Sequence, residues 1–582
     1  MRIEYHPSPG ARFGASESGK TLDAVIDIIT RRRDSGGTLM GDLMNNVEEG
    51  RHSVIDHLGW QHSVGKSALS VGAGYFEIDR SNWIRDYRET RITPAGERYR
   101  EEKGEAVPIL LRALNTHIGY SRAESGKYLF SAKLNYDLED TPRSEEADRR
   151  CTVLSDETSS LIAGHMSERT HSPSLDLYFQ HHLSASQTLT FDVLGTYIRS
   201  KSHREYAEDA DVFFSDIRGN KYSVIAEGIF EQRIGTHTLS GGLRHLQAYT
   251  ENDYTGSRAA KVGLRQSESS AYAEYQRSQE KWSYTASLTA SRLYHSQGDT
   301  HLSRYALQPA ASVQWMPTKG MSLRYDAVLH TKSPSLAAMN NVEQEIASGE
   351  VRRGNPHLKP FSVLDQRLTY GVEVGSWLSL NVGLAWQHEY KPIMEQVSWQ
   401  EGLFVRMSRN QRSFDRLTAD ANIIIRPWGE HLTVTLTPEV NRYVSRMQGC
   451  IHTYTLPKFL WSADFVWHHW TLGYQEMTCY ANYMYGERLM RERNMHLLSA
   501  GYKAERWHLQ LGVIDPFEKE YWMETRDFSP LLPSTSRAYT EKPFYVMARL
   551  SFRLGYGRRQ PASGSRKINN EDKDNGIMQG VR

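Results

Sequence analysis

Apolar and polar positions alternate with a two-residue period along most of this chain, from about Gly37 to Gly557. The pattern is clearest over 544–556, where every even position is apolar and the odd positions include Arg549 and Arg553. A strand places alternate side chains on opposite faces, so the pattern predicts a strand with one apolar and one polar face. The residues assigned to the apolar, lipid-facing side are Phe544, Val546, Leu550, Phe552, Leu554 and Tyr556.

The connections between such strands alternate between tight and long. Tight turns rich in Gly, Pro and Ser are predicted near 64–65, 124–126, 184–186, 234–235, 279–280, 317–320, 375–376, 427–429, 468–469 and 504–505. Longer connections are predicted at 80–107, 140–172, 201–218, 250–268, 332–360 and 516–541, with short ones near 401–402 and 449. The series predicts an all-β fold of about 22 antiparallel strands joined as hairpins.

Charge placement indicates that the closed sheet lies in a membrane. An Arg or Lys on the lipid face of a barrel costs about 2–4 kcal/mol near the bilayer midplane. Lys133, Arg324 and Arg549 all fall on the polar faces of their predicted strands. We therefore expect a transmembrane β-barrel of the cell outer membrane, with lipid outside and polar residues in the lumen. A soluble propeller or large sandwich also alternates, but a propeller would repeat its sequence at a fixed period, and this chain does not.

Composition agrees with a barrel and excludes a helical membrane protein. The mean hydropathy is −0.60, which fits a barrel because only alternate residues face lipid. No run of about 18 apolar residues exists. The net charge of +1 gives no sign of a nucleic-acid partner. Cys151, Cys450 and Cys479 show neither a disulfide framework nor metal-ligand spacing, so they are interpreted as incidental thiols.

The chain shows no catalytic motif. G-x-S-x-G, H-E-x-x-H and a phosphate-binding glycine loop are all absent from the sequence. The pairs His181–His182 and His468–His469 are adjacent strand residues that point to opposite faces, so neither pair suits one metal ion. Charge clusters such as 143–150 fall in long connections and are expected to be solvated. We expect no enzyme activity, no cofactor and no metal site.

Residues 3–37 carry a more specific signal. A strand is followed by the turn P-G-A-R-F-G and by A-V-I-D-I-I-T-R-R. This order resembles the end of the plug domain of TonB-dependent outer-membrane receptors, although Asp27 stands where that family usually has Asn. The residues that carry the resemblance are Pro9, Gly10, Ala11, Arg12, Phe13, Gly14, Val25, Ile26 and Ile28.

A second motif, G-N-P-H-L-K-P, spans 354–360 and is similar to G-N-P-x-L-K-P found late in these barrels. Its candidate residues are Gly354, Asn355, Pro356, Leu358, Lys359 and Pro360. One interpretation is a loop that captures ligand. The other, which we favour, is a structural turn that Asn355-Pro356 begins and that Pro360 leads into the next strand.

The resemblance implies three segments. Residues 1–36 are expected to be the C-terminal remnant of a plug domain, and residues 37–557 the barrel. The ending of the last strand is similar to that of the Bacteroidetes-type outer-membrane β-barrel family. Residues 558–582 are polar and charged, and we predict that this tail is disordered.

The family likeness also implies a function: uptake of a bulky, scarce solute that extracellular loops bind. A TonB-type energy-coupling complex would pull on the plug, and a surface lipoprotein is a further expected partner. The N-terminus lacks the apolar core of a secretion signal, so we expect a signal and most of the plug to precede Met1. The chain alone would then not perform coupled transport. The alternatives are a non-transporting surface barrel for binding or assembly and, less favoured, a soluble β-rich binding protein. The sequence does not identify the ligand.

Overall fold

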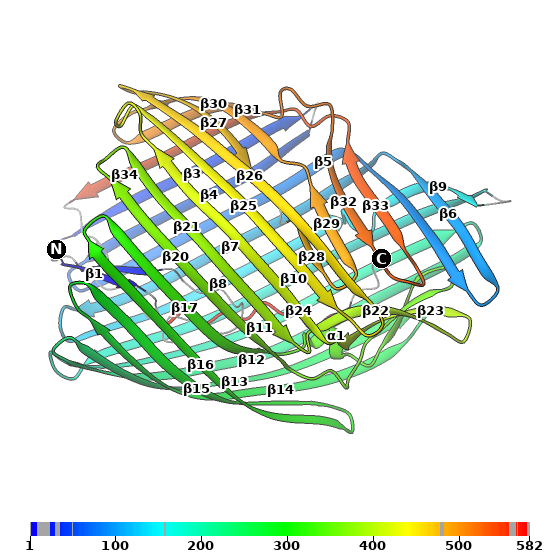
Figure 1. The fold of residues 1–582 in the computed structure, drawn as a ribbon, viewed down its shortest axis with the longest axis horizontal. Coiled ribbons are helices and arrows are strands. Elements are labelled where there is room, and N and C mark those ends of the chain that lie inside the picture. The colour runs from blue at the N-terminus through cyan, green and yellow to red at the C-terminus, as the bar shows by residue number, and fades with distance from the viewer. Residues whose placement is uncertain are drawn as a thin grey trace.

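The computed structural model describes residues 2–7, 24–29, 35–48, 51–155, 159–477, 482–557, 566 and 568–578. Nearly all of this chain is strand (Figure 1).

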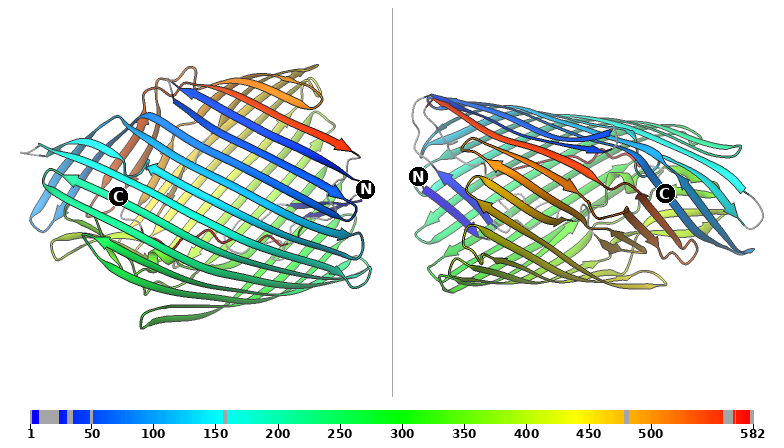
Figure 2. Two further views of the ribbon diagram at one scale, coloured as in Figure 1. Left: turned by 180° about the vertical axis from the view of Figure 1, so that it is seen from behind. Right: turned by 90° about the horizontal axis from the view of Figure 1, so that it is seen from above.

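Twenty-two strands of the described chain close into one antiparallel barrel, as the sequence predicts. The first and last strands pair with each other, with Leu39 opposite Leu554. Figure 2 shows them side by side, the first in blue and the last in red. The strands are β3 (Gly36–Glu48), β4 (Arg51–Val64), β5 (Ser67–Thr93), β7 (Val107–Glu124), β8 (Tyr128–Arg143), β10 (Ser159–His182), β11 (Gln187–Glu208), β12 (Asp211–Ile234), β13 (His237–Gly256), β14 (Ala260–Ser278), β15 (Trp282–Gln297), β16 (Thr300–Thr318), β17 (Met321–Lys332), β20 (Phe361–Val374), β21 (Leu378–Tyr390), β24 (Ser413–Ile425), β25 (Leu432–Arg446), β26 (Ile451–Trp467), β27 (Trp470–Met477), β30 (Met495–Lys503), β31 (Trp507–Ile514) and β34 (Tyr545–Gly557).

The predicted tight turns all fall between consecutive barrel strands at one end of the molecule, the left end in Figure 1. At Gly65 and Gly235 the backbone has φ of 55° and 60°, a left-handed conformation that glycine adopts without strain. Short turns mark the periplasmic end of an outer-membrane barrel, so the other end is extracellular.

The predicted long connections at 80–107, 140–172, 201–218 and 250–268 are wrong as loops, because paired strands run through most of each range. β11 and β12 remain paired out to Glu208 and Asp211, and only residues 209–210 turn. These residues are charged, but outside the bilayer both faces of a hairpin can be polar. The strands therefore continue beyond the membrane as paired extensions.

Shorter strands complete the extracellular wall. β28 (Tyr483–Tyr485), β29 (Arg488–Glu492), β32 (Tyr521–Asp527) and β33 (Ser534–Thr540) pair in this order and join the upper part of β5. β6 (Gly96–Glu105) and β9 (Arg149–Ser155) fill the wall between β5 and β10. A separate four-stranded sheet is made of β18 (Glu343–Ala347), β19 (Glu350–Arg353), β23 (Leu403–Asn410) and β22 (Ile393–Gln400). The short helix α1 (Leu336–Met339) precedes it.

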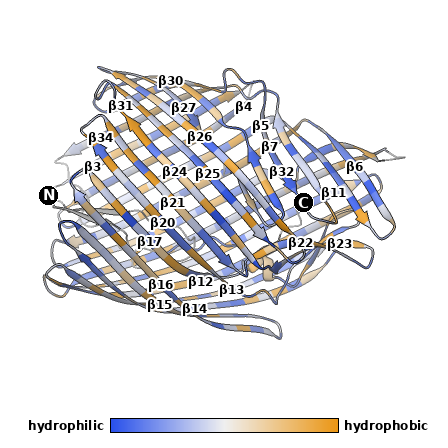
Figure 3. Ribbon diagram, viewed as in Figure 1, coloured by the Kyte–Doolittle hydropathy of each residue, from blue (hydrophilic) through white to orange (hydrophobic). Residues whose placement is uncertain are grey.

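Alternate side chains of the barrel strands face lipid and lumen. On β11, Phe191 and Val193 are exposed on the outer face, whereas Asp192 and Leu194 point inward and are buried. Figure 3 shows orange and blue residues in alternation along many strands. The described residues include no helix long and apolar enough to cross a membrane. The closed barrel with its apolar outer face is an outer-membrane barrel.

Alternate side chains of β34 lie on opposite faces of the barrel wall. The outward residues are half-exposed, and Arg549 points inward to Asp42 of β3, with its Nη2 2.5 Å from the carboxylate. The predicted lipid-facing residues that the structure leaves exposed are Phe544, Val546, Leu550, Leu554 and Tyr556, while Phe552 is of intermediate exposure.

The N-terminal strands β1 (Arg2–Pro7) and β2 (Ala24–Ile29) form a two-stranded antiparallel sheet with Tyr5 opposite Ile26. Figures 1 and 2 place this dark-blue pair at the periplasmic end. Val25, Ile26 and Ile28 of the predicted plug remnant belong to β2. The turn residues Pro9 to Gly14 lie outside the described residues.

The prediction of a disordered tail is wrong for Arg566 and for residues 568–578, which pack against the inner wall of the barrel. Arg566 forms ion pairs of 2.5 Å with Asp176 and 2.7 Å with Asp192. Ile568 is only 1% exposed. A polar composition predicts disorder for a segment in water, but the lumen supplies matching charged groups and an apolar cover.

Candidate functional site

A cavity of about 730 Å³ lies at the extracellular end, between the upper barrel wall and the four-stranded sheet. We call it the extracellular chamber. Strands β5, β29, β32 and β33 supply most of its wall, and β19 and β23 contribute from the separate sheet. Its lining residues are Arg85, Tyr87, Glu145, Glu146, Arg352, Arg406, Tyr483, Arg488, Met490, Arg491, Glu492, Met523, Glu524, Thr525, Asp527, Ser534, Ser536 and Ala538.

The lining of the chamber is highly charged but balanced. Five arginines face five carboxylates, which leaves no formal excess of either sign. The chamber therefore has no excess of positive charge that would attract anions. The fixed guanidinium donors and carboxylate acceptors instead suit a polar ligand that offers groups of both kinds.

Arg406 holds the four-stranded sheet to the barrel wall. Its side chain is buried, and its Nη1 lies 2.9 Å from Asp527 of β32 and 3.4 Å from Glu395 of β22. A third carboxylate, Glu350 of β19, accepts from Nε. Although burial opposes the charge, these carboxylates together hold the pKa of Arg406 above its usual range. Arg406 and these three carboxylates thus form a fixed ionic network at the wall of the chamber.

The motif at 354–360 acts as a structural clamp in this fold. A Cβ on Gly354 would lie 1.7 Å from the carbonyl oxygen of Asn340, so only glycine fits there. The Asn355 side chain donates to the carbonyl of Ser408 at 3.0 Å. Leu358 is 1% exposed in an apolar cluster with residues of α1.

Lys359 completes this clamp through its backbone. Its N–H donates to Asn410 Oδ1 at 2.9 Å, and the Asn410 amide donates back to the Lys359 carbonyl at 2.8 Å. None of the six motif residues lines the extracellular chamber. In this fold the contacts of the motif are those of a turn held in place by its neighbours.

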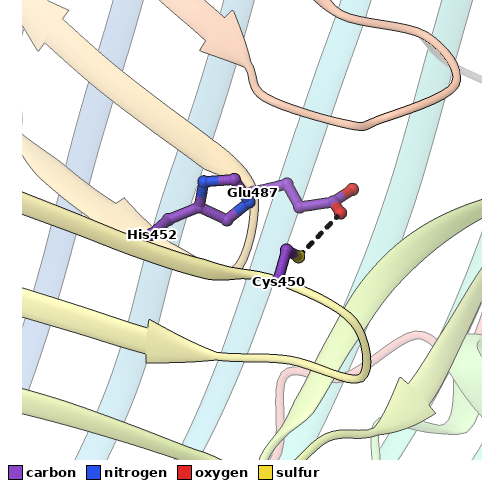
Figure 4. Close-up of side chains that lie close together, drawn as sticks. All are labelled: Cys450, His452 and Glu487. Carbon is purple, nitrogen blue, oxygen red and sulfur yellow. Dashed lines mark hydrogen bonds between the residues drawn. The ribbon is translucent and has the colours of Figure 1, made fainter.

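A second cluster of reactive side chains lies near the chamber (Figure 4). Cys450 lies in the turn between β25 and β26, and His452 is the second residue of β26. Glu487 lies in the turn between β28 and β29. The Cys450 thiol donates to Glu487 Oε1 at 3.7 Å. Metal-ligating atoms of the three side chains all lie within 4.8 Å of one another.

The protonation of this cluster reflects its burial. Burial raises the pKa of the Cys450 thiol and lowers the pKa of the His452 imidazole. Burial, together with the negative charge of Asp527, raises the pKa of Glu487 to about 7. Below about pH 7 the Glu487 carboxyl therefore holds its proton, and a cation would have to displace protons from the thiol and the carboxyl.

Sequence reasoning missed both sites. The chamber collects arginines from strands far apart in the chain, and of its lining only Glu145 and Glu146 belong to the charge cluster 143–150 that stands out in the sequence. Cys450 and Glu487 are 37 residues apart, which matches no metal-binding motif. Only the pairing of strands brings these residues together.

Comparisons with known proteins rest on structure alone. No protein-family model matches this chain, and no curated protein matches its sequence.

Several solved structures share its fold. The FrpB iron transporter from Neisseria meningitidis superposes with a TM-score of 0.61 at 11% identity, covering 95% of this chain and 87% of FrpB. The ferric enterobactin receptor PfeA from Pseudomonas aeruginosa gives 0.61 at 11% identity over 95% and 85%. The copper transporter OprC gives 0.66 at 9% identity, also over 95% and 85%. At such low identity the likeness shows the fold alone: this chain has the 22-strand barrel fold of the TonB-dependent outer-membrane receptors.

Proposed function

We propose that this chain is the barrel of an outer-membrane receptor that takes up a bulky polar solute. The extracellular chamber is the observation that carries the proposal. It is large enough for a small-molecule ligand, opens at the outer end of a closed barrel, and presents fixed donors and acceptors. The solved structures of similar fold include proteins named as iron and copper transporters, which supports a transport role without selecting the solute.

Energy for uptake would come through the periplasmic end. The outer membrane has no nucleotide supply, so a TonB-type complex acting on a plug would have to supply the work. The position of the β1–β2 sheet at the periplasmic end supports this part of the proposal. A surface lipoprotein that covers the chamber is a further partner under this proposal.

A non-transporting surface barrel is the second candidate function. The docked tail supports it, because Arg566, Ile568 and Asn570 occupy the lumen that a solute would have to cross. Under this alternative the chamber binds a ligand at the cell surface and the barrel passes nothing.

Ligand capture and transport can be tested separately. Cells that express the chain are given a panel of radiolabelled ferric chelates and other polar solutes too large for general porins. We expect surface binding of one class of solute, lost in Arg488→Ala and Arg491→Ala but kept in Arg98→Ala, which lies exposed on β6 outside the chamber.

Uptake into the cell that a protonophore abolishes would support coupled transport by this chain. Binding without any uptake would contradict transport by this chain alone, and it is the outcome expected both of the surface barrel and of a receptor barrel that needs further plug residues. If neither chamber variant changes the binding of any solute in the panel, the assignment of the chamber as the ligand site is wrong.

A further inference from the structure

We propose that Cys450, His452 and Glu487 form a binding site for a thiophilic divalent cation of the Zn²⁺ type at the extracellular end of the barrel. The inference does not depend on transport, because it concerns a site that none of the chamber-lining residues contributes to.

The three side chains converge from two connections. Cys450 is the last residue of the turn before β26 and His452 is the second residue of β26, and Figure 4 shows their side chains beside each other. Glu487 reaches them from the tip of the hairpin formed by β28 and β29. Figure 4 shows the thiol and the carboxylate of Glu487 directed at each other, with the imidazole beside them.

The spacing matches that of a tetrahedral zinc site. Zinc binds thiolate at about 2.3 Å and carboxylate oxygen at about 2.1 Å, so two such ligands at a tetrahedral angle lie about 3.6 Å apart. The Sγ–Oε1 distance is 3.7 Å. The remaining separations do not exceed 4.8 Å, and side-chain rotations can shorten them.

Two buried polar groups of the cluster would gain from a cation. The Nε2 atom of His452 is buried and has no hydrogen-bond partner within the described chain. Glu487 is only 5% exposed. A buried nitrogen without a partner costs free energy, and a bound cation would coordinate it together with the Glu487 carboxylate, which now accepts from the Cys450 thiol.

The surroundings favour a soft or borderline cation over Ca²⁺ or Mg²⁺, which prefer shells of oxygen ligands. Cys450 packs against a buried apolar cluster that includes Met394, Met447 and Met484. The Phe528 ring stacks on His452 with its centroid 5.6 Å away. The apolar cover limits access of water, and the set of one sulfur, one nitrogen and one oxygen ligand leaves a fourth position open.

Occupation of the site would join two parts of the extracellular wall. The β25–β26 turn carries Cys450, and the β28–β29 hairpin carries Glu487 together with the chamber residues Tyr483 and Arg488. A cation would therefore fix the hairpin that forms one side of the chamber.

The test is calorimetric titration of the full chain in detergent with Zn²⁺, under a phosphine reductant that keeps the thiols free. We expect one binding site in the wild type. Cys450→Ser and His452→Ala should each weaken binding on the order of 10-fold or more, and Glu487→Gln should weaken it less. Cys151→Ser is the matched control, because that thiol is buried in a separate cluster with Val153 and Tyr206.

X-ray absorption of the zinc-loaded protein gives a second readout, because it identifies the atoms bound to zinc directly. The wild type should show a sulfur scatterer at about 2.3 Å that disappears in Cys450→Ser. Binding that is equal in the wild type and all three variants would overturn the proposal. So would binding that survives these changes but is lost in His468→Ala, a residue exposed at the opposite end of the barrel.

Discussion

At the scale of single residues, Glu487 is deeply buried and its carboxyl group lies near a second acidic residue, Asp527. Its side chain approaches Cys450, and Asp527 contributes a further negative charge, while the guanidinium of Arg406 acts in the opposite direction. Burial is the largest of these influences and raises the pKa of Glu487 to about 7. A carboxyl of this kind makes stability depend on pH even without a metal.

We predict that Glu487→Gln stabilises the chain at pH 8 relative to pH 5. The unfolded wild type loses its proton near pH 4.5, whereas the folded protein holds it to about pH 7. Wild-type stability therefore falls as pH rises across this window, by up to about 3 kcal/mol, and glutamine removes the loss. Thermal unfolding in detergent with a chelator measures the effect. Glu401→Gln, at an exposed turn, is the control, and an equal Tm difference at both pH values would contradict the prediction.

Gly354 is the residue at which the clamp tolerates least change. A Cβ there would lie 1.7 Å from the Asn340 carbonyl oxygen, so Gly354→Ala must displace that backbone. We expect destabilisation of about 1–3 kcal/mol, the usual range for overpacking. Urea unfolding in detergent measures it against Gly195→Ala, where a Cβ meets no atom within 4 Å. Equal urea midpoints for Gly354→Ala and Gly195→Ala would show that the turn accommodates the added Cβ without loss of stability.

Among the elements, the docked C-terminal segment is the one with the most unusual partners. Lys221 of β12 pairs with Asp572 at 2.6 Å, and Asn570 donates to Asp192 at 2.9 Å. Both ends of the segment bury apolar side chains, Ile568 near one end and Ile577 near the other. The lumen wall therefore recognises this segment by charge and by apolar contact together.

Removal of the chain after Gly557 should raise the single-channel conductance in a planar bilayer, because the lumen loses the segment that fills it. Arg566→Glu should act in the same direction, since it replaces two attractive ion pairs with repulsion from Asp176 and Asp192. Lys573→Gln is the control, because Lys573 is an exposed residue of the same segment whose ion pair is with its own neighbour Glu571, and glutamine adds no repulsion toward Asp137 and Glu139 of the wall. Unchanged conductance on truncation would mean that the tail does not limit the pore.

The sequence predicts some of these elements and misses others, and the reasons are physical. Tight turns need Gly, Pro or polar residues at fixed places, so local chemistry locates them, as at Gly65 and Gly235. The paired extensions near Glu208 are charged on both faces and carry no apolar period. The docked tail depends on partners more than 300 residues away in the chain, such as Asp192 for Asn570. Composition alone cannot contain that information.

At the scale of the whole molecule, the barrel is a single closed sheet whose outer face meets lipid. The period of two residues predicts this directly, because every strand must present an apolar face outward. The chamber and the thiol cluster lie above the membrane, where no such period operates. Their residues come together only through strand pairing and the placement of the separate sheet.

Insertion into lipid gives a test of the outer face. Leu550→Arg places a charge on the exposed side of β34, which should cost about 2–4 kcal/mol near the midplane. Ser551→Arg places the same charge in the lumen, beside Asp42, where Ser551 now donates at 3.0 Å. Folding into lipid vesicles, followed by gel mobility with and without heating, should show impaired assembly only for the first. Equal assembly of both variants would contradict the predicted register.

A closed barrel with an even number of strands returns its chain to the side from which it entered. β34 does end at the periplasmic mouth, beside the start of β3. The docked segment then crosses the lumen once more, because the backbone N–H of Met578 donates to the hydroxyl of Tyr254, two residues before the outer turn of β13. With this added passage, the described chain runs between the two ends of the barrel an odd number of times instead of an even number. Among the described residues, Met578 therefore lies toward the outer end of the barrel, whereas β1 and β2 lie at the periplasmic end.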